Sequence, residues 1–95
     1  MNAKLGFLGI LFRANKARIG DELDKGLMKA NLVIVATDAS SNTAEAFIRR
    51  LVEHAIPHKI EFTKEELGEA LGRKEVNFLG IYDSKAAKAY LRKGE

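Results

Sequence analysis

The sequence NLVIVATDASSNT (Asn31–Thr43) decides the fold of this 95-residue chain. Its first part, Leu32–Ala36, is an unbroken apolar run rich in β-branched residues. Such a run is too short to span a membrane and is typical of a strand that is buried on both faces of a sheet. The small and polar residues that follow Thr37 favour a turn and a helix start, and we expect a helix from about Asn42. A buried strand that leads directly into a helix is the first half of a βαβ unit.

The rest of the chain predicts helices and strands that alternate around this central strand. Asn42 with Glu45, and Thr63 with Glu66, resemble capping boxes that start two helices, and Gly72 ends the second of these helices. The expected helices cover residues 3–14, 21–29, 42–55 and 63–72 and a final segment after Asp83, and the expected strands cover residues 17–19, 32–36, 59–62 and 78–82.

This alternation predicts an α/β fold in one domain, residues 1–95. We expect a three-layer α-β-α sandwich with a four-stranded, mainly parallel (mixed) sheet. Right-handed crossovers would place the loops after Ala36, Phe62 and Tyr82 at one end of that sheet.

Composition narrows the function classes. The chain has no cysteine, which excludes disulfides, thiolate metal sites and cysteine nucleophiles. The N-terminal sequence MNAKLGFLGILFRANK weakly resembles a signal peptide, but basic residues follow its apolar part, no A-x-A cleavage pattern is present, and the apolar part is too short for a bilayer. We therefore expect a cytoplasmic protein that does not associate with membranes.

The basic excess lies in the N-terminal third of the chain. Residues 1–31 contain six basic and three acidic residues, whereas residues 32–95 contain ten of each, for a net charge of +3. A solvated surface explains such an excess, and so does an anionic partner such as RNA.

Two aspartates follow predicted strands, where open α/β sheets commonly bind ligands. A carboxylate pair formed by Asp38 and Asp83 could hold Mg²⁺ or act as acid and base. The competing interpretation is that both are turn and helix-cap residues.

Other residues give no support for catalysis. His54 and His58 are four residues apart, but Pro57 interrupts the helix that would bring them to one face. Ser40 and Ser41 lack the flanking glycines of a nucleophile elbow, and Gly6 and Gly9 lie within a helical pattern rather than in a phosphate-binding loop. We expect no enzymatic activity, no metal or other cofactor, and no small-molecule substrate.

For binding, one cluster combines basic, acidic and glycine residues near a predicted helix start. Basic side chains and free backbone N–H groups there would pair with phosphates, and the carboxylates would accept hydrogen bonds from guanine or cytosine amino groups. Aromatic stacking residues are missing from this part of the sequence. The cluster consists of Arg13, Lys16, Arg18, Gly20, Asp21 and Glu22.

Five stretches resemble a known family. They are LGILFRANKARIG (residues 8–20), NLVIVATDASSNT (31–43), IP (56–57), TKEELGEALG (63–72) and VNFLGIYD (76–83). In this order they are similar to the small ribosomal RNA-binding family called L-seven-Ae, which shares its fold with the L-thirty-e proteins, and within it to the bacterial YlxQ-like branch. The resemblance implies an α-β-α sandwich.

Members of that family typically recognise the kink-turn, a sharply bent RNA helix, through a G-x-N-E motif with a following lysine and through a second loop. Gly20 matches the motif glycine, whereas Glu22 stands where asparagine is typical and Leu23 where glutamate is typical. Lys25 is one position away from the motif lysine, and Glu75-Val76 agrees with the second loop. Leucine cannot accept a hydrogen bond from a guanine edge, so the part of the motif that reads bases is altered.

The leading hypothesis is a non-enzymatic RNA-binding protein of ribosomal type that recognises structured, kink-turn-like RNA, with ribosome-associated proteins as further partners. The expected phosphate contacts are Lys16, Arg18, Lys25, Arg73 and Lys74, the expected base-edge acceptors are Asp21 and Glu22, and Gly20, Glu75 and Val76 complete the site. The alternative is a protein-interaction module on the same fold that has lost specific RNA recognition and docks through its apolar N-terminal helix, at Phe7 and Leu11.

Overall fold

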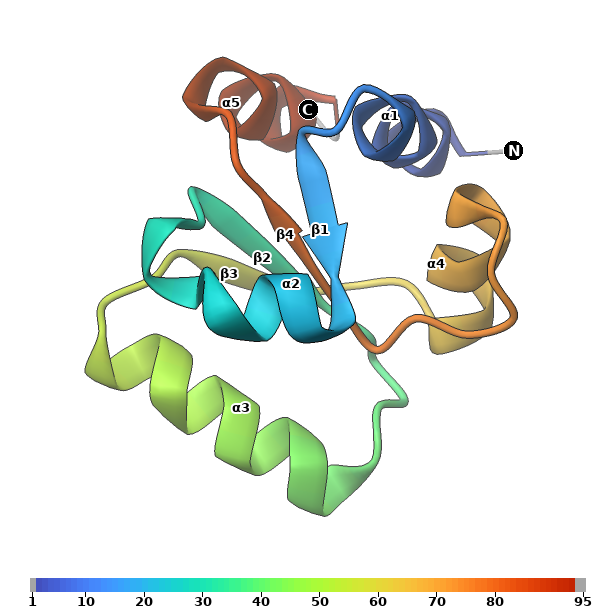
Figure 1. Ribbon diagram of the computed structural model, residues 1–95. Helices are drawn as coiled ribbons and strands as arrows, with labels where there is room; N and C mark the ends of the chain where they lie inside the picture. Colours follow the sequence, from blue (N-terminus) through green and yellow to red (C-terminus); the bar gives the residue numbers. More distant parts are fainter. Residues whose placement is uncertain (1, 94–95) are drawn as a thin grey trace.

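The computed structural model describes residues 2–93, and the predicted helices and strands are present in the predicted order (Figure 1). The helices are α1 (Ala3–Arg13), α2 (Gly20–Lys25), α3 (Ser41–Glu53), α4 (Lys64–Leu71) and α5 (Ser84–Arg92), with a short 3-10 helix, η1 (Leu27–Lys29). The strands are β1 (Ala17–Ile19), β2 (Leu32–Val35), β3 (His58–Ile60) and β4 (Phe78–Ile81).

Two local details differ from the sequence-based expectation. The helix expected over residues 21–29 is divided at Gly26 into α2 and η1, because glycine weakens a helix interior. The expected capping box of Asn42 and Glu45 is wrong: Ser40 is the N-cap residue of α3, and its side chain makes no capping hydrogen bond. The box of Thr63 and Glu66 is confirmed at the start of α4, with both reciprocal hydrogen bonds.

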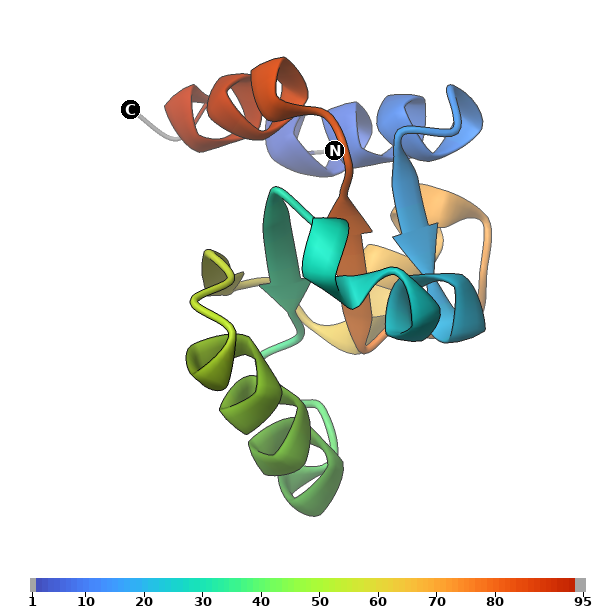
Figure 2. The ribbon, with the colours of Figure 1, turned by 60° about the vertical axis from the view of Figure 1, so that its left-hand side comes forward.

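The central strand is buried on both faces, as its sequence predicts. Leu32 and Ile34 pack into a core shared with α1, α4 and α5, whereas Val33 and Val35 pack into a second core with α2 and α3. The alternation follows from the two-residue period of a strand. Figures 1 and 2 show the resulting three-layer α-β-α sandwich, with the sheet between the two groups of helices.

The sheet is mixed, with strand order β1-β4-β2-β3. β1, β2 and β3 run in one direction, but β4 lies between β1 and β2 and is antiparallel to both, so only the β2–β3 pair is parallel. The expectation of a mainly parallel sheet therefore holds for strand direction and not for hydrogen-bonded pairs.

The reversal of β4 follows from the path of the chain after α4. The chain returns to the start of α4, where the Val76 N–H donates to the Lys64 carbonyl at 3.0 Å. The Ala36 N–H then donates to the Asn77 carbonyl at 2.8 Å, so β4 enters the sheet where β2 ends. The prediction that the loop after Tyr82 shares an end with the other two loops is therefore wrong.

A partly buried polar cluster connects three segments that are distant in sequence. The Lys4 ammonium lies 3.2 Å from the Glu61 carboxylate and 4.8 Å from the centre of the Tyr90 ring. The Tyr90 hydroxyl donates to the same carboxylate at 2.8 Å. Burial, with help from Glu61, raises the pKa of Tyr90, so this hydroxyl remains a donor. The cluster thereby fastens α1 and α5 to the connection between β3 and α4.

Most of the apolar surface of α1 faces the protein interior. Leu8 and Leu11 belong to the core, and Phe7 is half-buried with the Lys93 ammonium 4.8 Å from its ring centre. Ile10 points outward and is 55% exposed. Leu11 therefore packs the core rather than offering a docking surface, and its substitution would perturb the fold. None of the described helices is both long and apolar enough to cross a membrane.

Candidate nucleic-acid interface

The structure brings together the two segments that the sequence predicted to form a site. The turn between β1 and α2 and the loop after α4 line one groove of about 370 Å³, here called the loop groove. Its charged residues are Arg18, Asp21, Glu22 and Arg73, and Gly20 and Glu75 line its continuation. Residues about fifty positions apart in sequence therefore share a surface.

Gly20 gives the turn its shape. Its φ is +60°, in the left-handed region that favours glycine, and a Cβ built there would have no atom within 4 Å. The space in front of this backbone is therefore open to a ligand. Asp21 and Glu22 follow it on the exposed side of α2.

The loop after α4 is held against that helix by close backbone packing. Gly72, with a φ of +74°, ends α4. A Cβ on Gly68 would lie 2.7 Å from the Lys74 carbonyl oxygen, so only glycine allows this approach. Arg73 and Lys74 are exposed, whereas the Val76 side chain is buried in the core and leaves only its backbone for contacts.

The ring of Tyr82, the residue that follows β4, positions the Arg18 side chain. Its guanidinium carbon lies 4.5 Å from the centre of the Tyr82 ring, a cation–π contact. The Tyr82 hydroxyl donates to the Gly26 carbonyl at 3.0 Å, and burial raises the pKa of Tyr82 although Arg18 opposes this. Arg18 also lines a neighbouring hollow with Lys25 and Lys29, so this side of α2 carries three cations.

Leu23 does not face the groove. Its side chain is 1% exposed and packs against β4, where a Cβ on Gly80 would lie 2.5 Å from the Leu23 Cδ1 atom. Leu23 therefore contributes to the core, and the exposed acceptors of α2 beside the groove are Asp21 and Glu22.

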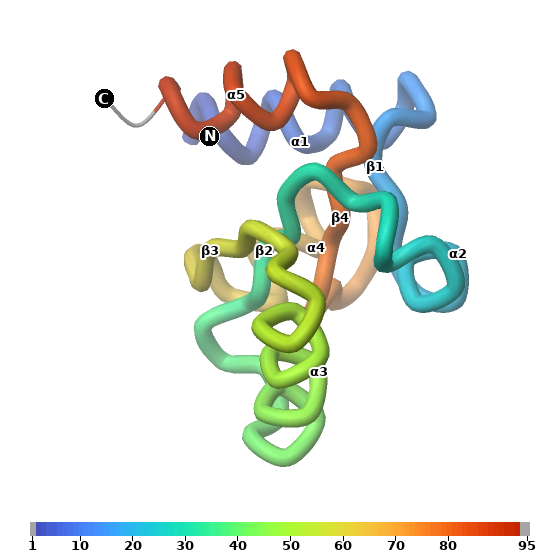
Figure 3. The backbone as a smooth tube through the Cα atoms, turned by 90° about the vertical axis from the view of Figure 1, so that its left-hand side faces the viewer, coloured from blue at the N-terminus to red at the C-terminus, as the bar shows by residue number. Residues whose placement is uncertain are grey.

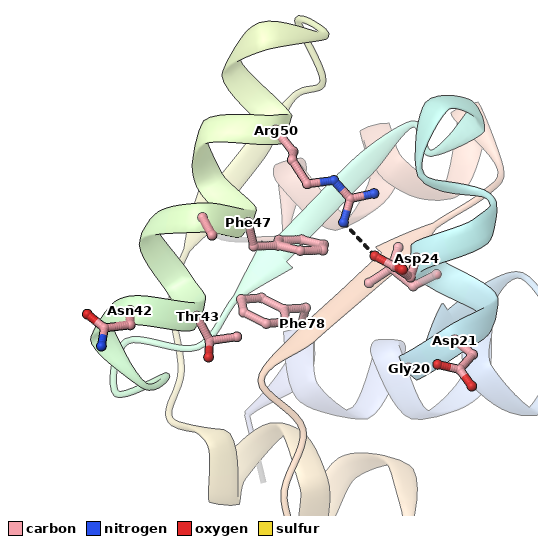
Figure 4. Close-up of a pocket in the computed structure, with 10 residues that line it drawn as sticks. Gly20, Asp21, Asp24, Asn42, Thr43, Phe47, Arg50 and Phe78 are labelled. Carbon is pink, nitrogen blue, oxygen red and sulfur yellow. Dashed lines mark hydrogen bonds and ion pairs between the residues drawn. The ribbon is translucent and has the colours of Figure 1, made fainter.

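A second, mainly apolar cleft of about 610 Å³ separates α2 from α3 and shares Gly20 and Asp21 with the groove. Figure 4 shows the Phe47 and Phe78 rings facing each other inside it, stacked with their centres 4.1 Å apart. At one side Arg50 forms an ion pair with Asp24 at 2.5 Å.

Sequence reasoning missed this cleft and its aromatic residues. Residues 13–22 contain no aromatic side chain, but aromatic rings from other segments lie beside them in the folded protein. In space, Phe78 lies in the cleft and the Phe12 ring lies 5.6 Å from the Arg73 guanidinium carbon. The apolar periodicity of α3 predicts that Phe47 faces the core. No residue near Phe47 or Phe78 in the sequence indicates that the two rings stack.

Some predicted site residues lie elsewhere. Lys16 precedes β1 at the opposite end of the sheet, where its ammonium lies 3.5 Å from the Asp83 carboxylate. Asp38 accepts a hydrogen bond from the Lys64 N–H at 2.8 Å. Because β2 and β4 are antiparallel, Asp38 and Asp83 lie at opposite ends of the sheet and cannot act as a carboxylate pair.

The histidines are also separate from the groove. His54 is the C-cap residue of α3, and the His58 Nδ1 atom lies 3.0 Å from the Ile56 carbonyl oxygen. Within residues 2–93, no group of three or more His, Cys, Asp or Glu side chains is placed to hold a metal ion.

The surroundings of Asp83 should make its contribution to the free energy of unfolding depend on pH. The Ala86 N–H, which donates to the Asp83 carboxylate at 2.8 Å, and the nearby Lys16 lower the pKa of Asp83. A carboxyl with a lowered folded pKa contributes stability above its unfolded pKa of about 3.9, and this contribution disappears as the pH falls through the folded pKa. We expect Asp83→Asn to be less stable than the wild type at pH 7 and equally stable near pH 2 in thermal melts. Glu53→Gln, at an exposed carboxylate on α3, is the control; a constant D83N deficit at both pH values would contradict the prediction.

Comparisons with known proteins agree with this architecture. A search of curated proteins found no match. Among solved structures, a protein of unknown function from Bacillus halodurans superimposes with a TM-score of 0.88 at 24% sequence identity, covering 98% of this chain and 97% of that one. This similarity shows the fold.

Residues 18–90 match the model of the ribosomal protein L7Ae/L30e/S12e/Gadd45 family. This match runs from β1 into α5 and includes Arg18, the turn before α2 and the loop after α4, and the chain therefore belongs to the ribosomal protein L7Ae/L30e/S12e/Gadd45 family.

Proposed function

We propose that this protein is a non-enzymatic, cytoplasmic RNA-binding protein that recognises kink-turn-like RNA through the loop groove. Its membership in a family of ribosomal type supports RNA binding in general. The observation that carries the finer proposal is the meeting of the Gly20 turn with the Arg73 loop, because this places cations, carboxylates and an open backbone on one surface.

The groove offers two kinds of contact. Arg18 and Arg73, which line the groove, and the exposed Lys25 and Lys74 beside it are the phosphate-binding side chains, which position RNA without reading its sequence. Asp21 and Glu22 are the acceptors for base amino groups exposed in the widened groove of a bent helix. Lys16, which lies at the other end of the sheet, is not part of this interface.

The cleft between α2 and α3 suits an unstacked base. Sequence-specific RNA recognition usually targets bases that are splayed out of the helix and that pack on aromatic side chains. Phe78 supplies such a surface beside Gly20 and Asp21, which the cleft shares with the loop groove. A bent RNA held in the groove would therefore have an apolar cleft within reach of a displaced base.

The test is a titration of the wild-type protein against a kink-turn RNA and an unbent duplex of equal length, at low and physiological salt. We expect at least a tenfold preference for the kink-turn at both salt concentrations, with a log–log salt slope of roughly −0.7 to −0.9 per phosphate contact. Equal binding to both RNAs would contradict shape recognition. Absence of binding to either RNA would instead favour the docking alternative through the exposed side of α1.

A matched pair of variants tests the base-edge role. Glu22→Ala removes the acceptor from the groove, whereas Glu45→Ala removes a carboxylate from the exposed side of α3. A good base contact contributes about 1–3 kcal/mol, so E22A should reduce the kink-turn preference by roughly tenfold and E45A should leave it unchanged. Equal effects of the two variants would exclude Glu22 as a base-reading residue.

A further inference from the structure

The tertiary structure collects the positive charge of the chain on two helices. α1 and α5 lie side by side (Figure 3), and Figure 1 shows β1 leading away from them toward α2. Residues 2–16 and 83–93, which form this pair, contain seven basic residues and one acidic residue. Residues 17–82 contain nine basic and eleven acidic residues. Three of the six basic residues of the N-terminal third belong to this pair, and the last segment of the chain adds four more, Lys85, Lys88, Arg92 and Lys93.

The exposed cations of α5 form one stripe. Lys85, Lys88 and Arg92 recur at i, i+3 and i+7, which places them on the same face of the helix and spreads them over about 10 Å. The buried residues of α5 are Ala86, Ala87 and Tyr90, so the stripe points away from the core. All three cations are exposed.

Within residues 2–93, Lys85, Lys88 and Arg92 form no ion pair with a carboxylate of the protein. The ion pairs of the α1–α5 pair instead join Lys4 to Glu61 and Lys16 to Asp83. Asp83, the one acidic residue of the pair, is already occupied by Lys16. Among the residues that the structure describes, the stripe therefore presents three charges that no carboxylate pairs with, the arrangement that attracts a polyanion.

We propose that the outer face of α5 is a second RNA-contact surface, which binds the phosphate backbone of a duplex without reading its sequence. This inference rests on the proposed function for its partner, because RNA is the polyanion that the loop groove is proposed to bind. Phosphate neutralisation by lysine and arginine releases counterions and needs no base contact. The aromatic residue of α5, Tyr90, is buried, so the stripe offers no ring on which a base could stack. This fits the backbone of a duplex rather than a stacked single strand.

The geometry also determines which RNAs reach the stripe. The molecule measures 30 Å along its longest axis, and Figure 1 shows α5 near one end of β1 and α2 at the other end. One helical turn of B-form DNA spans roughly 34 Å, and an A-form RNA duplex rises less per base pair, so an arm must be longer than one turn to extend past the molecule. A kink-turn with very short arms therefore contacts the groove alone, whereas arms of about twenty base pairs extend far enough to contact α5 as well.

The test compares two charge reversals that change the net charge equally. Lys88→Glu alters the middle of the stripe, and Arg49→Glu alters the exposed side of α3. For a kink-turn with long arms, we expect K88E to weaken binding about tenfold and to reduce the magnitude of the salt slope by roughly 0.7–0.9, and R49E to change affinity less than twofold. For a kink-turn with short arms, the two variants should bind alike. Lys88→Gln, with half the charge change, should give an intermediate loss, and thermal melts should show both K88E and R49E folded.

Each outcome decides the question. Equal affinities of K88E and R49E for the long-armed RNA would overturn the proposal, as would absence of RNA binding by the wild type. If the wild type binds kink-turn and plain duplex equally while K88E still weakens the long duplex, the kink-turn proposal fails and the α5 surface stands. If K88E instead reduces binding to phosphatidylserine-containing vesicles and leaves RNA binding unchanged, the stripe is a lipid surface and the RNA proposal is wrong.

Discussion

Replacing Glu61 with alanine should lower the free energy of unfolding by about 2–3 kcal/mol. The Glu61 carboxylate is the counter-charge of Lys4 and the acceptor for the Tyr90 hydroxyl, at 3.2 and 2.8 Å. Its removal leaves an ammonium group and a hydroxyl in a poorly hydrated site without a partner, and buried groups of this kind are costly. The side chains of Lys4 and Glu61 are 10% and 25% exposed, so residual hydration keeps the loss below that of a fully buried pair.

Urea denaturation measures this loss, and two further variants identify its origin. Glu53→Ala removes an exposed carboxylate from α3 and should change stability by less than about 0.5 kcal/mol. The double variant Lys4→Met/Glu61→Leu replaces the pair with apolar side chains and should recover part of the stability, because the unpaired charge is gone while the Tyr90 hydroxyl still lacks its acceptor. An E61A stability equal to that of the wild type would mean that the cluster is too well hydrated to matter.

Gly68→Ala should weaken RNA binding by at least tenfold without changing any charge. The added Cβ would lie 2.7 Å from the Lys74 carbonyl oxygen, 2.8 Å from its carbonyl carbon and 2.9 Å from the Arg73 carbonyl oxygen. These are backbone atoms, so no side-chain rotation relieves the overlap and the loop must move away from α4. Arg73 would then lose its position in the groove and Lys74 its position in the loop beside it, and such overpacking also costs about 1–3 kcal/mol of stability.

The control must separate loop displacement from general destabilisation. Ala70→Gly weakens the same helix by about 1 kcal/mol and leaves the contact between Gly68 and the loop intact. We expect A70G to bind the kink-turn RNA like the wild type at 25 °C, and G68A to bind it at least tenfold more weakly. Similar RNA affinities of the two variants would show that the loop tolerates the shift or does not contact the RNA.

The candidate site was only partly predictable from the sequence. The glycine, the acidic pair and the Arg73 loop were identified individually, from helix-start chemistry and from the family resemblance. Leu23 looked like a replaced base-reading residue, but the strand beneath α2 buries it. The aromatic cleft was missed because Phe47 and Phe78 are 31 positions apart and each has an ordinary local role, on a helix face and in a strand.

The sequence by itself determined the α/β class, the order of its helices and strands, and the burial of both faces of β2. These features depend on the periodicity of apolar residues and on capping within a few residues, and both can be read locally. The direction of β4, the separation of Asp38 from Asp83, the assembly of the loop groove and the packing of the basic helix α5 against α1 follow from the tertiary structure alone. Each of these depends on contacts between distant segments, such as the Val76–Lys64 hydrogen bond that turns β4 back into the sheet. Such contacts are chosen by the packing of the whole core rather than by any neighbouring residues.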